Sequence, residues 1–438
     1  MNRSDFMKNV SLIGLCTMMF PSFTFGEGKK PSQKIGVIGA GISGLYLADI
    51  LKKQGHKVTV LEAKNRAGGR IFENEGFYSS PIDLGAQWIH GHDNEMYKIV
   101  KNNKTPTYVD KKNESIKFLY KGLLLDDFPS EFYQFINELQ LKTPLQNDVS
   151  VLNYAKQFSN DSDFIELIEN VLTDTTTKAE RFSVNEVSKM TQQLDPVDYQ
   201  FKNTTMYGFL QERFVKGLKE EIVFNFPVKS VDYTNSLIKV SNKENQSYEF
   251  DKIIITVPIT VLKSNAIQFA PLLPNDKKKA LELIGMDKGL KLFLKFEKQF
   301  FNHSIFNGKY AGYYIDPTKN EASSQGLLAS LIMGIKAEMY YENPQKAIEN
   351  YLKELDANFD GQASKYYIDN LAQDWGAESY INGVYSYTKP GGTSAREIVR
   401  KPIGNKIFFA GEAMNICFDY GTVHGAIDSA IQVLKEFQ

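Results

Sequence analysis

One stretch near the start of the chain constrains the fold most. Residues 34–62 read KIGVIGAGISGLYLADILKKQGHKVTVLE, which predicts an apolar strand, a glycine-rich turn, a helix and a second strand. Gly39, Gly41 and Gly44 have the G-x-G-x-x-G spacing. The first glycine permits a tight turn, the second lets the backbone approach a pyrophosphate, and the third lets the helix pack on the strand. The stretch therefore predicts a parallel βαβ unit with nucleotide phosphates at the helix N-terminus.

Glu62 ends the second predicted strand and narrows the choice of nucleotide. A carboxylate at this place accepts hydrogen bonds from ribose hydroxyls and disfavours a 2′-phosphate. The ligand is therefore expected to be FAD or NAD rather than NADP.

Three further segments indicate which of these two nucleotides is the ligand. EAKNRAGGRIF at 62–72, DLGAQWIHG at 83–91 and KIFFAGEAMNICFDYGTVHGAIDSAIQVLKEF near the C-terminus resemble the flavin-containing amine oxidase superfamily. That superfamily includes monoamine oxidases, polyamine oxidases and lysine-specific histone demethylases, and the motifs here are most similar to those of polyamine oxidases. The resemblance implies FAD as the cofactor.

The resemblance also implies roles for particular residues. Arg70 would neutralise the pyrophosphate or brace the loop near the flavin, and Glu412 would bind the ribityl or phosphate region. The backbone at Thr422 and Val423, at a helix N-terminus, would meet the pyrimidine edge, where the helix dipole stabilises negative charge. Val228 would contact the adenine side. Further expected cofactor contacts are Ser43, Gln87, Trp88 and Trp375.

Residue 384 bears on how the flavin is held. Val384 stands where monoamine oxidases carry the cysteine that is linked covalently to FAD. The resemblance therefore implies noncovalent FAD.

The stretch GLKLFLKF at 289–296 predicts a strand, because apolar residues alternate along it. From periodicity alone, Lys291 and Lys295 share a solvated face. The resemblance separates them, because the family has a strand of the type K-x-x-L-x-F whose lysine holds a water near flavin N5. Lys291 matches that lysine, and Lys295 keeps the solvated role. The strand is then expected to pass from the flavin cavity to the surface between them.

The substrate side is expected to be aromatic. By resemblance, Tyr385 flanks the substrate amine and Tyr380 belongs to the wall in front of the flavin. His90 matches a position that faces the substrate in animal polyamine oxidases. It would bind an amine, act as an acid or base, or serve as a polar residue at the pocket rim. Candidate acids for distal ammonium groups remain open: Asp93, Glu95, Asp195 and Asp198.

The reaction implied by the resemblance is oxidation of a C–N bond. A hydride passes to flavin N5, and dioxygen is reduced to hydrogen peroxide. The expected substrate is an amine, and within that class a polyamine. Two alternatives stay open. One is an oxidase or desaturase of another substrate on the same scaffold, such as an amino acid, a porphyrinogen or a carotenoid. The other is a flavin-binding protein without turnover.

Charge and composition argue against several other classes. The net charge is −1 and basic residues are spread along the chain, so no nucleic-acid partner is expected. The five histidines and two cysteines show no metal-ligand spacing, so no metal is predicted. Residues 1–26 contain Arg3 and Lys8 before a short apolar run, which is typical of an export signal and too short to span a membrane. The mature protein is expected to be periplasmic or secreted and soluble, by the general or the twin-arginine route.

These motifs predict an α/β fold with two interleaved domains. A Rossmann-like FAD-binding domain, with a parallel sheet and a β-meander, is assigned to residues 34–94, 206–270 and 376–438. An α+β substrate-binding domain is assigned to residues 95–205 and 271–375.

Overall fold

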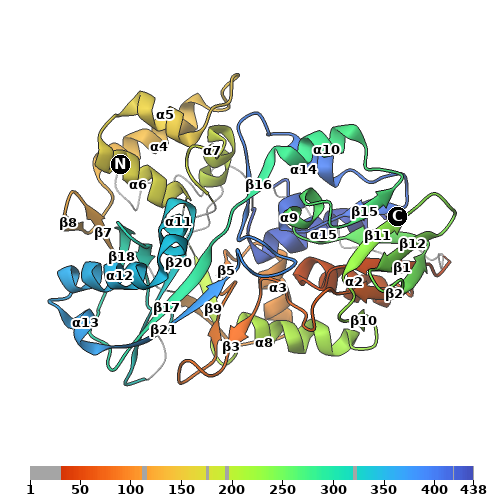
Figure 1. Cartoon of the computed structure of the whole chain (residues 1–438), viewed down its shortest axis with the longest axis horizontal. Helices are drawn as coiled ribbons and strands as arrows, with labels where there is room; N and C mark the ends of the chain where they lie inside the picture. The colour runs from red at the N-terminus through yellow and green to blue at the C-terminus, as the bar shows by residue number, and fades with distance from the viewer. Residues whose placement is uncertain are drawn as a thin grey trace.

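The computed structural model describes residues 31–110, 116–173, 177–192, 197–318, 323–417 and 419–437. The predicted export signal at 1–26 and Asp195 lie outside the described residues. The chain forms two halves that lie side by side (Figure 1). Segments from the beginning, middle and end of the sequence meet in the half that holds α2, β1 and α15.

The first of these halves is built on a parallel sheet of five strands. Its order is β10-β2-β1-β14-β23, so the βαβ unit of the N-terminus sits at its centre. The strands are β1 (Lys34–Ile38), β2 (Lys57–Leu61), β10 (Ile222–Val223), β14 (Lys252–Ile255) and β23 (Ile407–Phe409). Their near-continuous apolar character is that of strands covered on both faces.

Helices cover one face of this sheet and a second sheet covers the other. On one face lie α2 (Ile42–Lys53), α3 (Glu95–Asn102) and α15 (Val423–Glu436), which share one apolar core with the strands. The other face packs on a four-stranded sheet of order β13-β12-β11-β15. Its strands are β11 (Val228–Asp232), β12 (Ile238–Asn242), β13 (Ser247–Phe250) and β15 (Gln268–Ala270). Since β11, β12 and β13 form a meander, the predicted Rossmann-like fold is confirmed.

The other half combines helices with one mixed sheet, in which β18 and β7 are parallel, and one antiparallel sheet. Its helices are α4 (Ser130–Lys142), α5 (Val151–Phe158), α6 (Ser162–Thr173), α7 (Val184–Gln192), α11 (Gly334–Glu342), α12 (Pro344–Asn358) and α13 (Gln362–Tyr366). One sheet contains β7 (Ile116–Tyr120), β8 (Leu123–Leu125), β18 (Ser304–Gly308) and β19 (Gly312–Tyr314), and another contains β17 (Leu290–Phe296), β20 (Gly326–Ile332) and β21 (Tyr367–Asp374). The assignment of residue ranges to two domains stays a prediction.

Strand β17 departs from the pattern that its periodicity predicted. It lies between β20 and β21, and both of its faces are buried. Leu292 and Leu294 face the core shared with α12, while Phe293 packs in a second cluster with Tyr78 and Leu84. The prediction of a strand with one face exposed to solvent was wrong, because the segment 72–88, which follows β2, packs on the second face.

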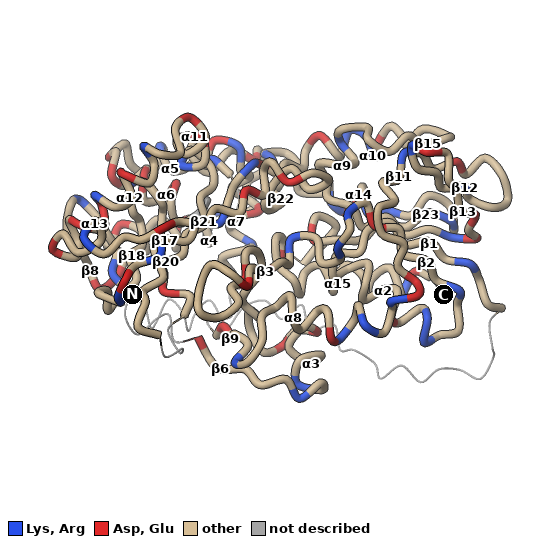
Figure 2. Tube along the Cα trace, turned by 60° about the horizontal axis from the view of Figure 1, so that its bottom comes forward, with Lys and Arg blue, Asp and Glu red and all other residues tan. Residues whose placement is uncertain are grey.

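The two halves are joined by the antiparallel pair of β16 (Ile284–Met286) and β22 (Ser386–Thr388). The remaining elements are β3 (Glu73–Asn74), β4 (Ile82–Asp83), β5 (Ile89–His90), β6 (Thr107–Asp110), β9 (Asp198–Phe201), α8 (Met206–Leu210), α9 (Ile259–Lys263), α10 (Asn275–Glu282) and α14 (Ala395–Arg400), a π-helical turn at Gln211–Val215, and 3₁₀ turns at Lys216–Leu218 and Glu412–Met414. Basic and acidic residues are interspersed over both halves (Figure 2). Within the described ranges, the helices all fall short of the length and apolar character that a membrane crossing requires.

Candidate active site

A long cavity runs between the two halves at the carboxyl ends of the parallel strands. Its walls come from the glycine turn, the segments 61–64, 68–71 and 226–229, and loops from both halves. Predicted site residues that line it are Gly39, Gly41, Ser43, Glu62, Arg70, Val228, Trp375, Tyr380, Tyr385, Glu412, Thr422 and Val423. This is the edge of an open α/β sheet at which nucleotides bind.

The glycines of the turn have different geometric roles. Gly39 has a φ of +109°, which disfavours any side chain. A Cβ at Gly44 would lie 2.1 Å from the Gly39 carbonyl oxygen, so this glycine permits the approach of helix to strand. A Cβ at Gly41 would meet no protein atom within 4 Å, and Gly41 lines the cavity. Gly44 therefore shapes the turn, while Gly41 leaves space for a ligand.

The carboxylate of Glu62 holds the turn from the opposite strand. One oxygen accepts a hydrogen bond from Ala40 N at 2.7 Å and the other from Lys64 N at 2.9 Å. Burial raises the pKa of Glu62, while the two N–H groups lower it. Each carboxylate oxygen has a second lone pair, so ribose hydroxyls can still donate to Glu62.

The donors at this end fit a dinucleotide. The hydroxyl of Ser43 is buried against the cavity and has no hydrogen-bond partner in the structure. Helix α2 begins without a side-chain cap and with no acidic residue in its first turn. Its first N–H groups and the positive end of its dipole are therefore open to an anion, as a pyrophosphate requires.

An ion pair between the half-buried Arg70 and the buried Glu412 lies in the cavity lining. Arg70 Nη1 lies 3.1 Å from Glu412 Oε1 and also donates to the Val384 carbonyl. The other Glu412 oxygen accepts from Ser386 Oγ at 2.6 Å and from Gly421 N at 3.0 Å. Burial alone would raise the pKa of Glu412, but Arg70 and its other donors hold it below its usual value. The pair thus fixes the loops on both sides of the cavity.

Aromatic and aliphatic side chains form the other end. Trp375 is buried and its Nε1 donates to the Leu84 carbonyl at 3.1 Å. Tyr380 has a positive φ of 64° and is 44% exposed. The ring of Tyr385 packs against Gly421, since a Cβ there would lie 2.8 Å from Tyr385 Cδ1. Predicted substrate-side tyrosines therefore share one cavity with the predicted cofactor residues.

Lys291 is buried below this aromatic end rather than in the cavity lining. Its side chain is 1% exposed, and Nζ donates to the carbonyls of Asp83 and Gly85 and to Gln87 Oε1, at 2.7, 3.2 and 2.9 Å. Burial raises the pKa of Asp83, and the nearby Lys291 opposes that rise. Lys295, four residues on, is half-buried and donates to the Phe77 carbonyl at 3.0 Å. Lys295 is more exposed than Lys291 but is not a fully solvated lysine, and neither side chain lines the cavity, so the role of Lys291 stays a prediction.

Gln87 and Trp88 do not line the cavity. The amide of Gln87 connects Lys291 to Gln200, with Nε2 donating to Gln200 Oε1 at 2.8 Å. Trp88 Nε1 donates to Asp110 Oδ2 at 2.7 Å. Both side chains therefore support the segment that carries the Lys291 acceptors, and their predicted contact with the cofactor stays a prediction.

His90 lies beside the N-terminus of α15, outside the cavity lining. Its Nδ1 is 2.7 Å from Asp198 Oδ1, and its ring is 6.1 Å from that of His424. Asp198 was one of the open candidates for binding ammonium groups. Burial, with Asp419 and Glu95 nearby, raises the pKa of Asp428 to about 6 against the effect of His424. We call these residues the rim cluster: Glu95, Asp198, Asp419, Asp428, His90 and His424.

The structure places further residues at the site that the sequence analysis did not predict. Lys64, Lys229 and Lys243 also line the cavity, although no motif marks the last two. Arg396 is 2% exposed, donates to Ser386 Oγ at 2.8 Å and lies 3.5 Å from the centre of the Tyr420 ring. It thereby supports the partners of Glu412. Contacts between such distant segments become visible only in the fold.

Known proteins resemble the chain along almost its whole length. The sequence model of a family described as flavin containing amine oxidoreductase matches residues 42–433. The chain is 27% identical to Lysine-specific histone demethylase 2 of Homo sapiens, over 92% of this chain and 53% of that protein, so it spans about half of its length. It is 26% identical to Polyamine oxidase 5 of Oryza sativa subsp. japonica, over 94% and 88%. A structure of wild-type putrescine oxidase bound to putrescine has a TM-score of 0.81 at 20% identity, covering 93% of this chain and 99% of that one.

Proposed function

Because the chain belongs to the flavin-containing amine oxidoreductase family, with FAD as its cofactor, we propose that it oxidises amines with dioxygen and releases hydrogen peroxide. The observation that carries the proposal is the shared cavity, whose one end fits a dinucleotide while its other end presents Tyr385 and Trp375. When bound, FAD supplies the acceptor for the hydride and the route of electrons to dioxygen. Val384 in place of a cysteine supports noncovalent binding.

The residues of the chain would bind and orient the two reactants. The turn at Gly39–Gly44, Glu62 and the start of α2 would hold the adenosine and pyrophosphate parts, while Glu412 and the start of α15 would hold the rest. The apolar wall of Leu331, Tyr385 and Trp375 excludes water and lowers the pKa of an amine, which favours the neutral form that loses a hydride. For Lys291 to hold a water at the reacting edge, it would have to exchange one of its three hydrogen bonds to the segment 83–87 for that water.

The substrate that we propose is a polyamine. The rice relative is named a polyamine oxidase, and the structural relative was solved with putrescine. The rim cluster adds physical support, because Asp419 and Glu95 lie close enough to Asp428 to raise its pKa, although Lys98 and His424 act in the opposite direction. Carboxylates held close together repel one another, and a polycation relieves that repulsion. The proposed distal ammonium groups would lie there, with the reacting amine near Tyr385.

Anaerobic reduction of the bound flavin tests the proposal directly. The loss of flavin absorbance is followed with putrescine, spermidine, spermine, aromatic amines and amino acids in turn, and peroxide is measured after air is admitted. We expect the fastest bleaching with a polyamine. Bleaching by none of these compounds would contradict amine oxidation, and bleaching by aromatic amines alone would contradict the polyamine substrate. A porphyrinogen or a carotenoid that bleaches the flavin would favour the alternative oxidases.

We also propose that the protein is exported from the cytoplasm. The support is the basic start and short apolar run within residues 1–26. N-terminal sequencing of the protein purified from its native source would test this. A mature chain that still begins at Met1 would contradict it.

A further inference from the structure

Two lysines at the nucleotide end of the cavity form no ion pair with any residue that the structure describes. Four cationic side chains line the cavity: Lys64, Arg70, Lys229 and Lys243. The first two are paired with carboxylates, those of Glu378 and Glu412. Among the described residues, Lys229 and Lys243 form no ion pair and no side-chain hydrogen bond. The charge of the lining is therefore not balanced at this end.

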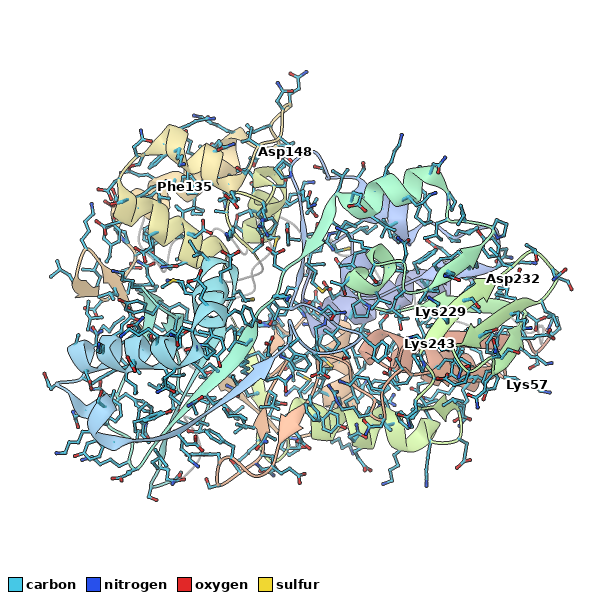
Figure 3. The ribbon with its side chains drawn as sticks, in the orientation of Figure 1. Lys57, Phe135, Asp148, Lys229, Asp232 and Lys243 are labelled. Carbon is cyan, nitrogen blue, oxygen red and sulfur yellow. The ribbon has the colours of Figure 1, made fainter. Side chains whose placement is uncertain are left out.

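A β-bulge explains why Lys229 lies in the cavity wall. Strands β11 and β12 pair Val228 with Asn242 and then Ser230 with Ser241, so Lys229 is the extra residue. A bulge breaks the alternation of a strand and re-aims the side chain of the extra residue. Lys243 follows Asn242 directly, so the two lysines come from paired ends of the same ribbon and lie near each other (Figure 3).

The turn that carries Lys243 is held in place. Asn242 is buried. Its Nδ2 donates to Gln246 Oε1 at 2.7 Å, and its Oδ1 accepts from the backbone N–H of Gln246 at 2.9 Å. A third bond joins their backbones at 3.1 Å. The backbone of Lys243 is thus fixed while its ammonium group stays exposed, so its charge stays at the cavity entrance.

The nearby acid does not pair with these lysines. Glu62 is the acidic lining residue of this end; its carboxylate is buried and held by two backbone N–H groups, and it forms no ion pair with either lysine among the described residues. The formal charges of Lys229, Lys243 and Glu62 still leave a net positive charge here, and the pyrophosphate of FAD carries two negative charges. A cleft lined by one sign of charge raises the local concentration of a ligand of opposite sign and speeds its association.

We propose that Lys229 and Lys243 form an electrostatic entrance that accelerates the capture of FAD by its nucleotide end. The proposal rests on FAD as the cofactor and goes beyond the oxidation of amines. Exposed charges act over about 8 Å at physiological ionic strength and are screened by salt. The two lysines should therefore change the association rate more than the dissociation rate, and only at low salt.

The test measures FAD capture by the full-length chain after its flavin has been removed. Stopped-flow quenching of flavin fluorescence gives the association rate at about 20 mM and about 500 mM KCl. For the double variant K229Q/K243Q we expect association about 5- to 10-fold slower at low salt and less than about 2-fold slower at high salt. The dissociation rate should change by less than about 2-fold.

Lys57 provides a matched control. It is exposed, forms no ion pair among the described residues and begins β2, so it lies at the amino end of that strand, whereas the cavity lies at the carboxyl ends; Figure 3 shows it apart from Lys229 and Lys243. Lys57→Gln removes one positive charge and should leave FAD capture unchanged. Riboflavin is a second control, because it lacks phosphates, and its capture should not depend on the two lysines.

Three results would overturn the proposal. One is equal association rates for K229Q/K243Q and the native chain at low salt. Another is an equal loss in Lys57→Gln, which would indicate net charge alone. The third is an equal loss with riboflavin, which would indicate a change of shape. If the double variant does not fold, the single variants K229E and K243E replace it, with a loss per site as the expected result. No amine is present, so the test stands apart from the proposed oxidation.

Discussion

The two ends of the cavity use different parts of the peptide chain. At the nucleotide end, the backbone groups of one short turn form most of the wall that faces the ligand. Gly39, Gly41 and Glu62 all lie within a single βαβ unit. At the amine end, side chains such as Leu331 and Tyr385 come from separate strands and loops. The shape of the nucleotide end therefore depends on glycines that lack side chains. The shape of the amine end depends on side chains that distant segments of the chain bring together.

The largest expected effect lies in the glycine turn. Gly44→Ala puts a Cβ 2.1 Å from a backbone oxygen, so we expect a loss of about 3 kcal/mol in the free energy of unfolding, together with loss of FAD. Gly41→Ala meets no protein atom within 4 Å. It should change stability by less than about 0.5 kcal/mol and yet weaken FAD binding about 100-fold. Urea unfolding and FAD titration measure both. Tight FAD binding by Gly41→Ala would break the comparison.

The next effect concerns the ion pair that joins the two ends. Glu412→Gln removes the buried charge that faces the half-buried Arg70 and the buried Arg396, which should cost about 3 kcal/mol of unfolding free energy in urea titrations. Glu378→Gln is the control, because Glu378 and Lys64 form a more exposed pair, and its cost should stay below about 1 kcal/mol. Equal costs would show that burial of the first pair does not matter.

The same variant has a pH signature. The folded state holds the pKa of Glu412 below its usual 4.5. The pair therefore stabilises the fold fully above that value, and the stabilisation is lost as the pH falls through the lower folded pKa. Below pH 4.5, the native chain should lose stability more steeply than Glu412→Gln. Parallel slopes would contradict this.

At the amine end, Tyr385→Ala should separate catalysis from cofactor binding. Loss of the ring from the wall should lower kcat/KM for the best amine about 100-fold, while the Kd for FAD changes less than about 2-fold. Tyr385→Phe keeps the ring and should stay within about 3-fold. If FAD binding weakens as much as kcat/KM falls, the two ends are not separable.

The smallest effect is expected at the rim cluster. Burial raises the pKa of Asp428 to about 6, so the ionised form is disfavoured in the folded state. Stability is therefore lost as the pH rises from about 4 through 6, and Asp428→Asn removes that loss. We expect the variant to be about 1 kcal/mol more stable at about pH 7.5 and equal to the native chain near pH 4. A polyamine should narrow the difference at the higher pH, and no narrowing would argue against its binding there.

The nucleotide end could be predicted because its determinants are local. The turn at Gly39–Gly44 and the carboxylate of Glu62 lie in one supersecondary unit, so spacing in sequence translates into spacing in space. Thr422 as the cap of α15 was predictable for the same reason, and its side chain accepts from Gly425 N.

The rest could not be predicted because it depends on strand pairing and distant contacts. The bulge that brings Lys229 to the cavity is a property of the β11–β12 register, not of either strand alone. The carbonyls that accept from Lys291 belong to a segment about 200 residues away, and the same segment covers the face of β17 that was expected to be wet. The periodicity of one strand does not predict which distant segment of the chain will pack on its other face.

The packing of Tyr385 against Gly421 has a consequence for anyone who redesigns this protein. The ring occupies the space into which a side chain at 421 would grow. A library that varies position 421 alone would therefore return mainly displaced rings, whatever amine it is screened with. Since Gly421 also has a φ of +72°, a side chain at 421 would be strained even with the ring removed, so selectivity is better sought by varying 385 while 421 stays glycine.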